Sequence, residues 1–159
     1  MTEKIIFCKS NNDPYGEFSN FYPCVLIVDG VEYSSVEHYY QSKKFKGTEF
    51  EEQVRMQSSP MKAKKLAYSE EAKKYFDVKW DEHKLVVMGR GLYHKFIIER
   101  FKNLLLSTGS SEIIEYSDKD YYWGRGRDGA GYNMMGKLLM ELRERLKIEE
   151  ERKNKFDFF

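Results

Sequence analysis

Two long segments of the chain repeat their apolar residues at the spacing of an α-helix, and this pattern constrains the fold most strongly. The segments cover residues 81–99 and the chain from Asn133 onward. Residues three or four positions apart share one helix face, so each helix must bury an apolar stripe. Gly89 and Gly91 interrupt the first segment, where glycine disfavours a continuous helix. The stripes comprise Leu85, Met88, Leu92 and Phe96 in the first helix, and Met135, Leu138, Leu139, Leu142 and Leu146 in the second.

Shorter helices are predicted from their start signals. Ser59 followed by Pro60 is typical of an N-cap and the first helical position. Ser34 with Glu37 fits the S-x-x-E capping box at the start of another helix. The expected segments are 35–45, 49–56, a helix from Ser59, a short one at 69–71, and a short apolar segment at 103–107 that Gly109 ends.

The β-structure is predicted to be small and to lie mainly near the N-terminus. Residues 4–8 resemble a strand followed by a turn at 11–14, and residues 25–33 resemble a hairpin around Asp29-Gly30. Residues 113–116 fit either a strand or a helix end. We therefore expect an α-rich α+β fold, a compact single-domain helical structure with a small β element.

Size and charge limit the classes of protein that remain. A chain of 159 residues suits one domain, which we place at residues 1–148, with a charged and flexible tail at 149–159. A net charge of +1 gives no field for binding long DNA or a membrane, although a nucleotide site needs only local charge. Two unpaired cysteines, no signal-peptide pattern and no membrane-length apolar run predict a cytoplasmic protein with free thiols.

The helix at 35–45 carries a carboxylate, an amide and an amine on one face. Glu37 and Lys44 fall within about 20° of each other around the axis and about 10 Å apart along it, with Gln41 between them. The face could simply be solvated, with Glu37 serving the capping box. A carboxylate and a desolvated lysine are also the groups that cleave glycosidic bonds or attack sugar carbons.

Two further segments could bind a ligand or serve only the fold. The glycines of residues 123–133 could bring backbone N–H groups close to a phosphate, or could form a flexible surface loop. In residues 16–21, a phenylalanine could stack on a base while Asn20 pairs with its edge, or both rings could pack in the core. The histidines His38, His83 and His94 lack metal-ligand spacing, and we expect them to be structural or exposed.

Taken in order, eight segments between about residues 5 and 147 resemble the NADAR superfamily, whose best-known branch is the YbiA-like N-glycosidases. No segment is decisive alone, but the ordered set is highly specific. The segments are residues 16–22, 35–45 and 58–61, Lys95-Phe96, residues 104–109, 120–124 and 131–133, and residues 136–143.

The resemblance implies a metal-independent enzyme without a cofactor that hydrolyses the bond between ribose C1 and an amino nitrogen. In one branch the substrates are phosphoribosylamino-pyrimidine intermediates of riboflavin biosynthesis. In another the substrate is ADP-ribosylated guanine in DNA or RNA, and ADP-ribosylation is reversed. The alternative from another class is a non-catalytic module that binds ADP-ribose or nucleotides. Such a module would lack the acid and the lysine, and this chain has both.

The family's functional residues carry over by motif. Glu37, Lys44 and Asp120 are the implied catalytic residues, with Lys43 as the alternative to Lys44. Arg125 and Arg127 depart from the family pattern and could bind phosphate or be surface charges. If Glu37 faces the ligand, Ser34 or Ser35 must cap the helix without it. The implied substrate-binding residues are Phe18, Ser19, Asn20, Phe21, Gln41, Trp123, Gly124, Arg125 and Asn133.

The resemblance leaves two routes for the reaction. In direct hydrolysis, Glu37 or Asp120 protonates the leaving nitrogen or stabilises an oxocarbenium-like sugar. In the second route, the sugar opens and Lys44 captures it as a Schiff base that water releases.

Overall fold

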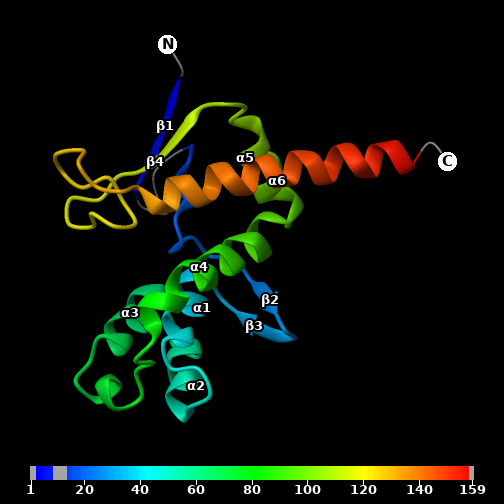
Figure 1. The fold of residues 1–159 in the computed structure, drawn as a ribbon. Coiled ribbons are helices and arrows are strands. Elements are labelled where there is room, and N and C mark those ends of the chain that lie inside the picture. Colours follow the sequence, from blue (N-terminus) through cyan, green and yellow to red (C-terminus); the bar gives the residue numbers. More distant parts are fainter. Residues whose placement is uncertain (1–2, 9–13, 158–159) are drawn as a thin grey trace. The chain divides into compact units, whose positions relative to one another are not determined.

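The computed structural model describes residues 3–8 and 14–157 (Figure 1). The chain forms two compact units, one made of residues 1–19 and 96–159, the other of residues 20–95. Residues 11–13 of the turn expected at 11–14 lie outside the described residues. Within the described part, no helix is long and apolar enough to cross a membrane.

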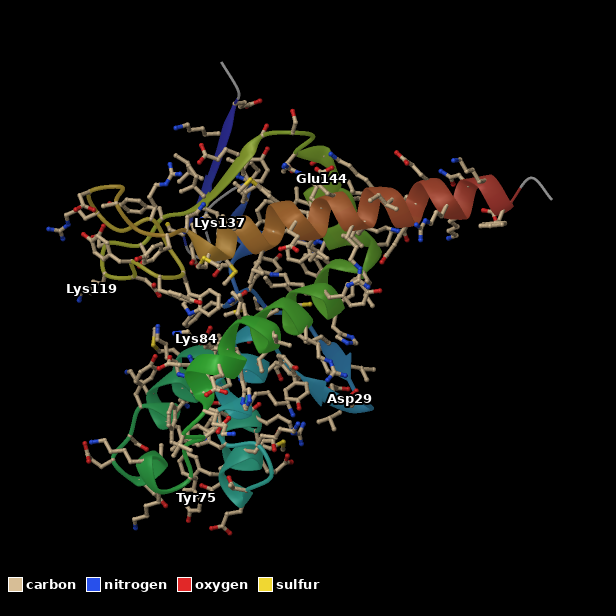
Figure 2. The ribbon with its side chains drawn as sticks, viewed as in Figure 1. Asp29, Tyr75, Lys84, Lys119, Lys137 and Glu144 are labelled. Carbon is tan, nitrogen blue, oxygen red and sulfur yellow. The ribbon has the colours of Figure 1, made fainter. Side chains whose placement is uncertain are left out.

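The second unit begins with the predicted hairpin, formed by strands β2 (Leu26–Val28) and β3 (Val31–Tyr33). The strands are antiparallel, with Leu26 opposite Tyr33 and Val28 opposite Val31. Asp29 and Gly30 both have positive φ, 52° and 77°, as a two-residue turn of this kind requires. Asp29 (Figure 2) also accepts a hydrogen bond from Arg90.

Four helical segments follow where the sequence predicts them. Ser59 caps α3 by accepting a hydrogen bond from the backbone of Lys62, and Pro60 occupies its first turn. The short helix expected at 69–71 is a 3₁₀ turn that begins at Glu71, and the hydroxyl of Ser69 accepts from the backbone N–H of Ala72. The elements are α1 (Val36–Lys43), α2 (Glu49–Arg55), α3 (Pro60–Ala67) and the 3₁₀ turn Glu71–Lys74.

Helix α1 packs against α2 and α3 around a small aromatic core. The rings of Phe45 and Phe50 meet edge to face at 4.9 Å, and Tyr75 (Figure 2) stacks on Phe50 at 5.2 Å. Val54 and Ala63 complete the contact between α2 and α3. This core holds α1 and α3 side by side, so side chains from both segments can contribute to the same site.

Helix α4 (Trp80–Phe96) is continuous despite its two glycines. Gly91 permits a close approach, because a Cβ there would lie 2.7 Å from Cδ1 of Tyr39 on α1. A Cβ at Gly89 would meet nothing within 4 Å. Of the predicted stripe, Met88 is buried, as are Leu92 and Phe96, while Leu85 is partly buried.

The first unit contains a two-stranded parallel sheet, in which β1 (Lys4–Phe7) pairs with β4 (Glu112–Glu115). Of the two alternatives for residues 113–116, the strand is correct rather than the helix end, although it covers residues 112–115 and ends before Tyr116. The short 3₁₀ turn Gly16–Phe18 follows β1, and α5 (Glu99–Ser107) precedes β4. Helix α6 (Met134–Phe156) packs on β4 and α5, as Figure 1 shows.

Helix α6 buries the predicted stripe and extends further than expected. Met135, Leu139, Leu142 and Leu146 are buried, while Leu138 is partly buried. The segment from residue 149, expected to be a flexible tail, is helical up to Phe156. Ion pairs between Arg145 and Glu149 and between Lys102 and Glu150 support this turn of the helix.

Candidate active site

Helix α1 turns its polar face into the protein rather than to solvent. Glu37, Gln41 and Lys44 are 5%, 2% and 4% exposed. The solvated-face alternative is therefore wrong for this helix. Nζ of Lys44 is surrounded by the rings of Tyr40, Tyr68 and Trp80, at 5.4, 4.3 and 6.0 Å from their centroids. We call these six residues the Lys44 site.

The start of α1 leaves Glu37 available to this site. Ser35 is the N-cap, and its hydroxyl oxygen accepts from the backbone N–H of His38 at 3.2 Å. The Glu37 carboxylate accepts a hydrogen bond of 2.7 Å from Nε2 of Gln41. The expectation that Ser34 or Ser35 provides the cap is confirmed, with Ser35 in that role.

His38 supports the cap and is structural, as expected. Its Nε2 lies 2.9 Å from the carbonyl oxygen of Gln57, which can only accept, so this nitrogen carries the proton. Nδ1 then accepts from the hydroxyl of Ser35 at 2.8 Å. Burial lowers the pKa of His38, although the bond to Gln57 opposes this, so the ring is neutral at pH 7.

The fold alters the protonation of Lys44. Burial lowers its pKa to about 8, with the nearby charge of Glu37 opposing the shift and that of Lys64 adding to it. At pH 7 about one such lysine in ten is neutral, against fewer than about one in a thousand for an ordinary lysine. A neutral amine is the form that attacks a sugar carbon.

Lys43 has a different environment. Its Nζ donates to Oε1 of Glu51, whose other oxygen accepts from the backbone N–H of Gly47. Burial lowers the pKa of Lys43, but the hydrogen bonds to Glu51 and Tyr33 outweigh it and the pKa is raised. Lys43 therefore remains a charged ion-pair partner.

Two amide oxygens beside Glu37 lack partners. Oδ1 of Asn20 and Oε1 of Gln41 are buried and have no hydrogen bond in the described structure. Both residues adjoin Glu37, because the backbone oxygen of Asn20 accepts from its N–H and Gln41 donates to its carboxylate. A buried unsatisfied acceptor costs about 1–3 kcal/mol. Donors of a ligand, such as ribose hydroxyls or an amine, would satisfy both.

The segment at 18–21 is divided between the two units. Phe18 is fully buried and meets Phe7 and Phe96 edge to face at 5.7 and 5.8 Å, which is the core-packing alternative. Ser19 is also buried. Phe21 is half-buried in the second unit, where Nζ of Lys64 lies 5.8 Å from its ring centroid.

Asp120 and its neighbours hold the loop of the first unit. Oδ1 of Asp120 accepts from the backbone N–H groups of Tyr122 and Trp123, at 3.0 and 2.7 Å. Arg125 donates to Glu112. Trp123 is half-buried and Gly124 is buried.

Asn133 links this loop to the sheet. It has a φ of 51°, its Nδ2 donates to the carbonyl of Ile113, and its Oδ1 accepts from the N–H of Glu115. Arg127 forms a longer ion pair with Asp118. These contacts give Asp120, Arg125 and Asn133 each a place in the fold of the first unit.

Comparison with known proteins places the chain in a family. The model of the NADAR domain matches residues 6–147. This chain belongs to the NADAR family. N-glycosidase YbiA of Escherichia coli strain K12 is 39% identical over 94% of this chain and 93% of its own length. A riboflavin biosynthesis protein of Vibrio vulnificus is 35% identical over 92% of this chain and 40% of its own.

The NADAR fold is also shared with a solved structure. The NMR structure of Escherichia coli YbiA has a TM-score of 0.84 and 38% identity, covering 94% of this chain and 89% of that one. The α-rich fold with small β elements is thereby confirmed.

Four residues near Lys44 were not identified from the sequence of this NADAR chain. Tyr40 precedes Lys44 by one helical turn, a spacing that could have indicated contact. Tyr68 and Lys64 come from the α3 segment, and Trp80 begins α4. No local pattern relates these three residues to α1.

Proposed function

We propose that this NADAR protein hydrolyses the N-glycosidic bond between ribose C1 and an amino nitrogen. The observation that carries the proposal is the pairing, on one buried helix face, of Glu37 with a lysine of lowered pKa. The similarity to proteins named as N-glycosidases supports it. The catalytic groups we assign are Glu37 and Lys44, while Asp120 remains a prediction from the family motif.

Glu37 is assigned to proton transfer at the leaving nitrogen. Its carboxyl group lies in a buried environment and is oriented by Nε2 of Gln41. A carboxylate so placed, once it has taken up a proton, can pass that proton to the amino nitrogen as the C1–N bond breaks. The unsatisfied oxygens of Asn20 and Gln41 would accept hydrogen bonds from the sugar or the amine.

Lys44 is assigned to a covalent step on the opened sugar. Its neutral amine adds to C1, and the leaving amine departs with a proton, which leaves an imine between C1 and Nζ. Water then adds to C1, the bond to Nζ breaks, and the free sugar and the neutral lysine are restored. One water is consumed overall. Lys43 is unsuited to this step because its ion pair with Glu51 keeps it charged.

Two substrates fit this chemistry. Phosphoribosylamino-pyrimidines are the first candidate, because one relative is named as a riboflavin biosynthesis protein. ADP-ribosylated guanine in DNA or RNA has the same ribose C1 joined to an amino nitrogen. The aromatic rings around Lys44 suit either substrate, since they exclude water from the amine and offer flat surfaces to a sugar or base.

Borohydride trapping during turnover tests the covalent step. Each substrate is incubated with the protein and borohydride, and the modified peptide is located by mass spectrometry. We expect an adduct on Lys44 that is absent from Lys44→Arg and retained in Lys43→Arg. Turnover without any adduct would favour direct hydrolysis. Ligand binding without release of the base would instead identify a non-catalytic module.

A further inference from the structure

Helix α3 carries three lysines and no acidic residue. Lys62, Lys64 and Lys65 are exposed, and within the described residues none of them forms an ion pair. Lys62 only donates to the hydroxyl of Ser58. Elsewhere in the protein, the exposed Lys73 and the half-buried Lys84 are each paired with a carboxylate three residues away, on Glu70 and Asp81.

One of these lysines shares a helix face with the Lys44 site. Lys64 and Tyr68 are four residues apart, so they lie above one another on α3. The ring of Tyr68 faces Nζ of Lys44 at 4.3 Å, and Nζ of Lys64 lies 5.8 Å from the ring of Phe21. Lys65 is rotated away from this face by about 100°.

We propose that Lys64 is an anion-binding residue at the edge of the Lys44 site, and that it recognises a phosphate group of the ribosyl substrate. The proposal rests on the proposed function, because it names the charged part of that substrate. The charge of Lys64 repels that of Lys44 and adds to the lowering of the Lys44 pKa, which burial chiefly causes and the charge of Glu37 opposes. A phosphate beside Lys64 would offset this repulsion.

The proposal gives a reason why a protein of nearly neutral charge can select a phosphorylated ligand. The Phe21 ring beside Lys64 supplies a flat apolar surface next to the charge. Arg125 and Arg127, the other two cations considered for phosphate, are paired with Glu112 and Asp118 in the first unit. Lys64 has no such carboxylate partner in the described structure.

Equilibrium binding of ribose 5-phosphate and of ribose tests the proposal without requiring turnover. Calorimetry is carried out on wild type, Lys64→Gln, Lys64→Arg and the matched control Lys65→Gln, an exposed lysine on another face of the same helix. Wild type and Lys65→Gln should prefer ribose 5-phosphate over ribose. Loss of a charge-assisted hydrogen bond in Lys64→Gln should reduce that preference about 10- to 100-fold, and Lys64→Arg should restore most of it.

Three outcomes would overturn the assignment. Equal loss in Lys64→Gln and Lys65→Gln would indicate diffuse attraction, and an unchanged preference in Lys64→Gln would place the phosphate elsewhere. No phosphate preference in wild type would remove the subsite. Hydrolysis of the substrates is measured separately, so a protein that prefers ribose 5-phosphate through Lys64 but releases no base would refute the proposed function and leave this inference standing.

Discussion

Nζ of Lys44 lies 4.3 Å from the centre of the Tyr68 ring, so a buried amine is covered by a side chain that is itself 67% exposed. Burial is the main cause of the lowered pKa of Lys44. Tyr68 is therefore placed to control how much water reaches the amine, and hence which form of the lysine prevails at neutral pH.

Removal of the Tyr68 ring should shift the titration of Lys44. In wild type, the rate of any step that needs the neutral amine should rise with pH and level off above a pKa of about 8. In Tyr68→Ala, hydration of the amine should move this pKa up toward the ordinary value of 10.5 and lower the rate at pH 7 about tenfold or more. The pH profile of adduct formation on Lys44 measures this pKa, and Tyr68→Phe is the control that keeps the ring. A profile unchanged in Tyr68→Ala would contradict this role.

Replacement of Glu37 by Gln should abolish most of the turnover and leave the fold intact. Glutamine has the same shape and its amide oxygen can still accept from Gln41, but it cannot transfer a proton. We expect a loss of about 100-fold or more in kcat. Rates of base release and the circular dichroism spectrum are compared with those of Glu52→Gln, an exposed acid on α2. Equal rates for Glu37→Gln and wild type would exclude Glu37 as the acid.

The cap of α1 predicts different effects at two adjacent serines. Ser35→Ala removes the acceptor for the N–H of His38 and the donor to its Nδ1, so the free energy of unfolding should fall by about 1–2 kcal/mol. Ser34 is exposed, and Ser34→Ala should change the free energy of unfolding by less than about 0.5 kcal/mol. Urea denaturation measures both variants. Equal effects would show that the cap does not depend on Ser35.

The two glycines of α4 should respond in opposite directions to alanine. At Gly91 the new methyl group would lie 2.7 Å from the Tyr39 ring, so Gly91→Ala should lower the stability by about 1–3 kcal/mol. A Cβ at Gly89 would have nothing within 4 Å. Gly89→Ala should therefore raise the stability by about 0.5–1 kcal/mol, because alanine has a higher helix propensity than glycine. Thermal unfolding of both variants tests the pair, and a Gly91→Ala protein as stable as Gly89→Ala would contradict the close approach of α1 and α4.

The sequence by itself determined the helices, the hairpin and the alignment of the catalytic candidates. A period of 3.6 residues places Glu37, Gln41 and Lys44 on one face, and Asp29-Gly30 can adopt the positive φ angles of a tight turn. Both follow from bonds and angles within a few residues, so no distant part of the chain is needed to predict them.

Only the tertiary structure decided what that face does. Periodicity fixes the angle of a side chain around its own helix but not what packs against it, so the sequence allowed a solvated stripe as readily as a buried site. Tyr68 and Trp80 bury Lys44 from other elements and lower its pKa, while Glu51 keeps the neighbouring Lys43 charged. Desolvation and ion pairing depend on these distant contacts, and they make two adjacent lysines chemically different.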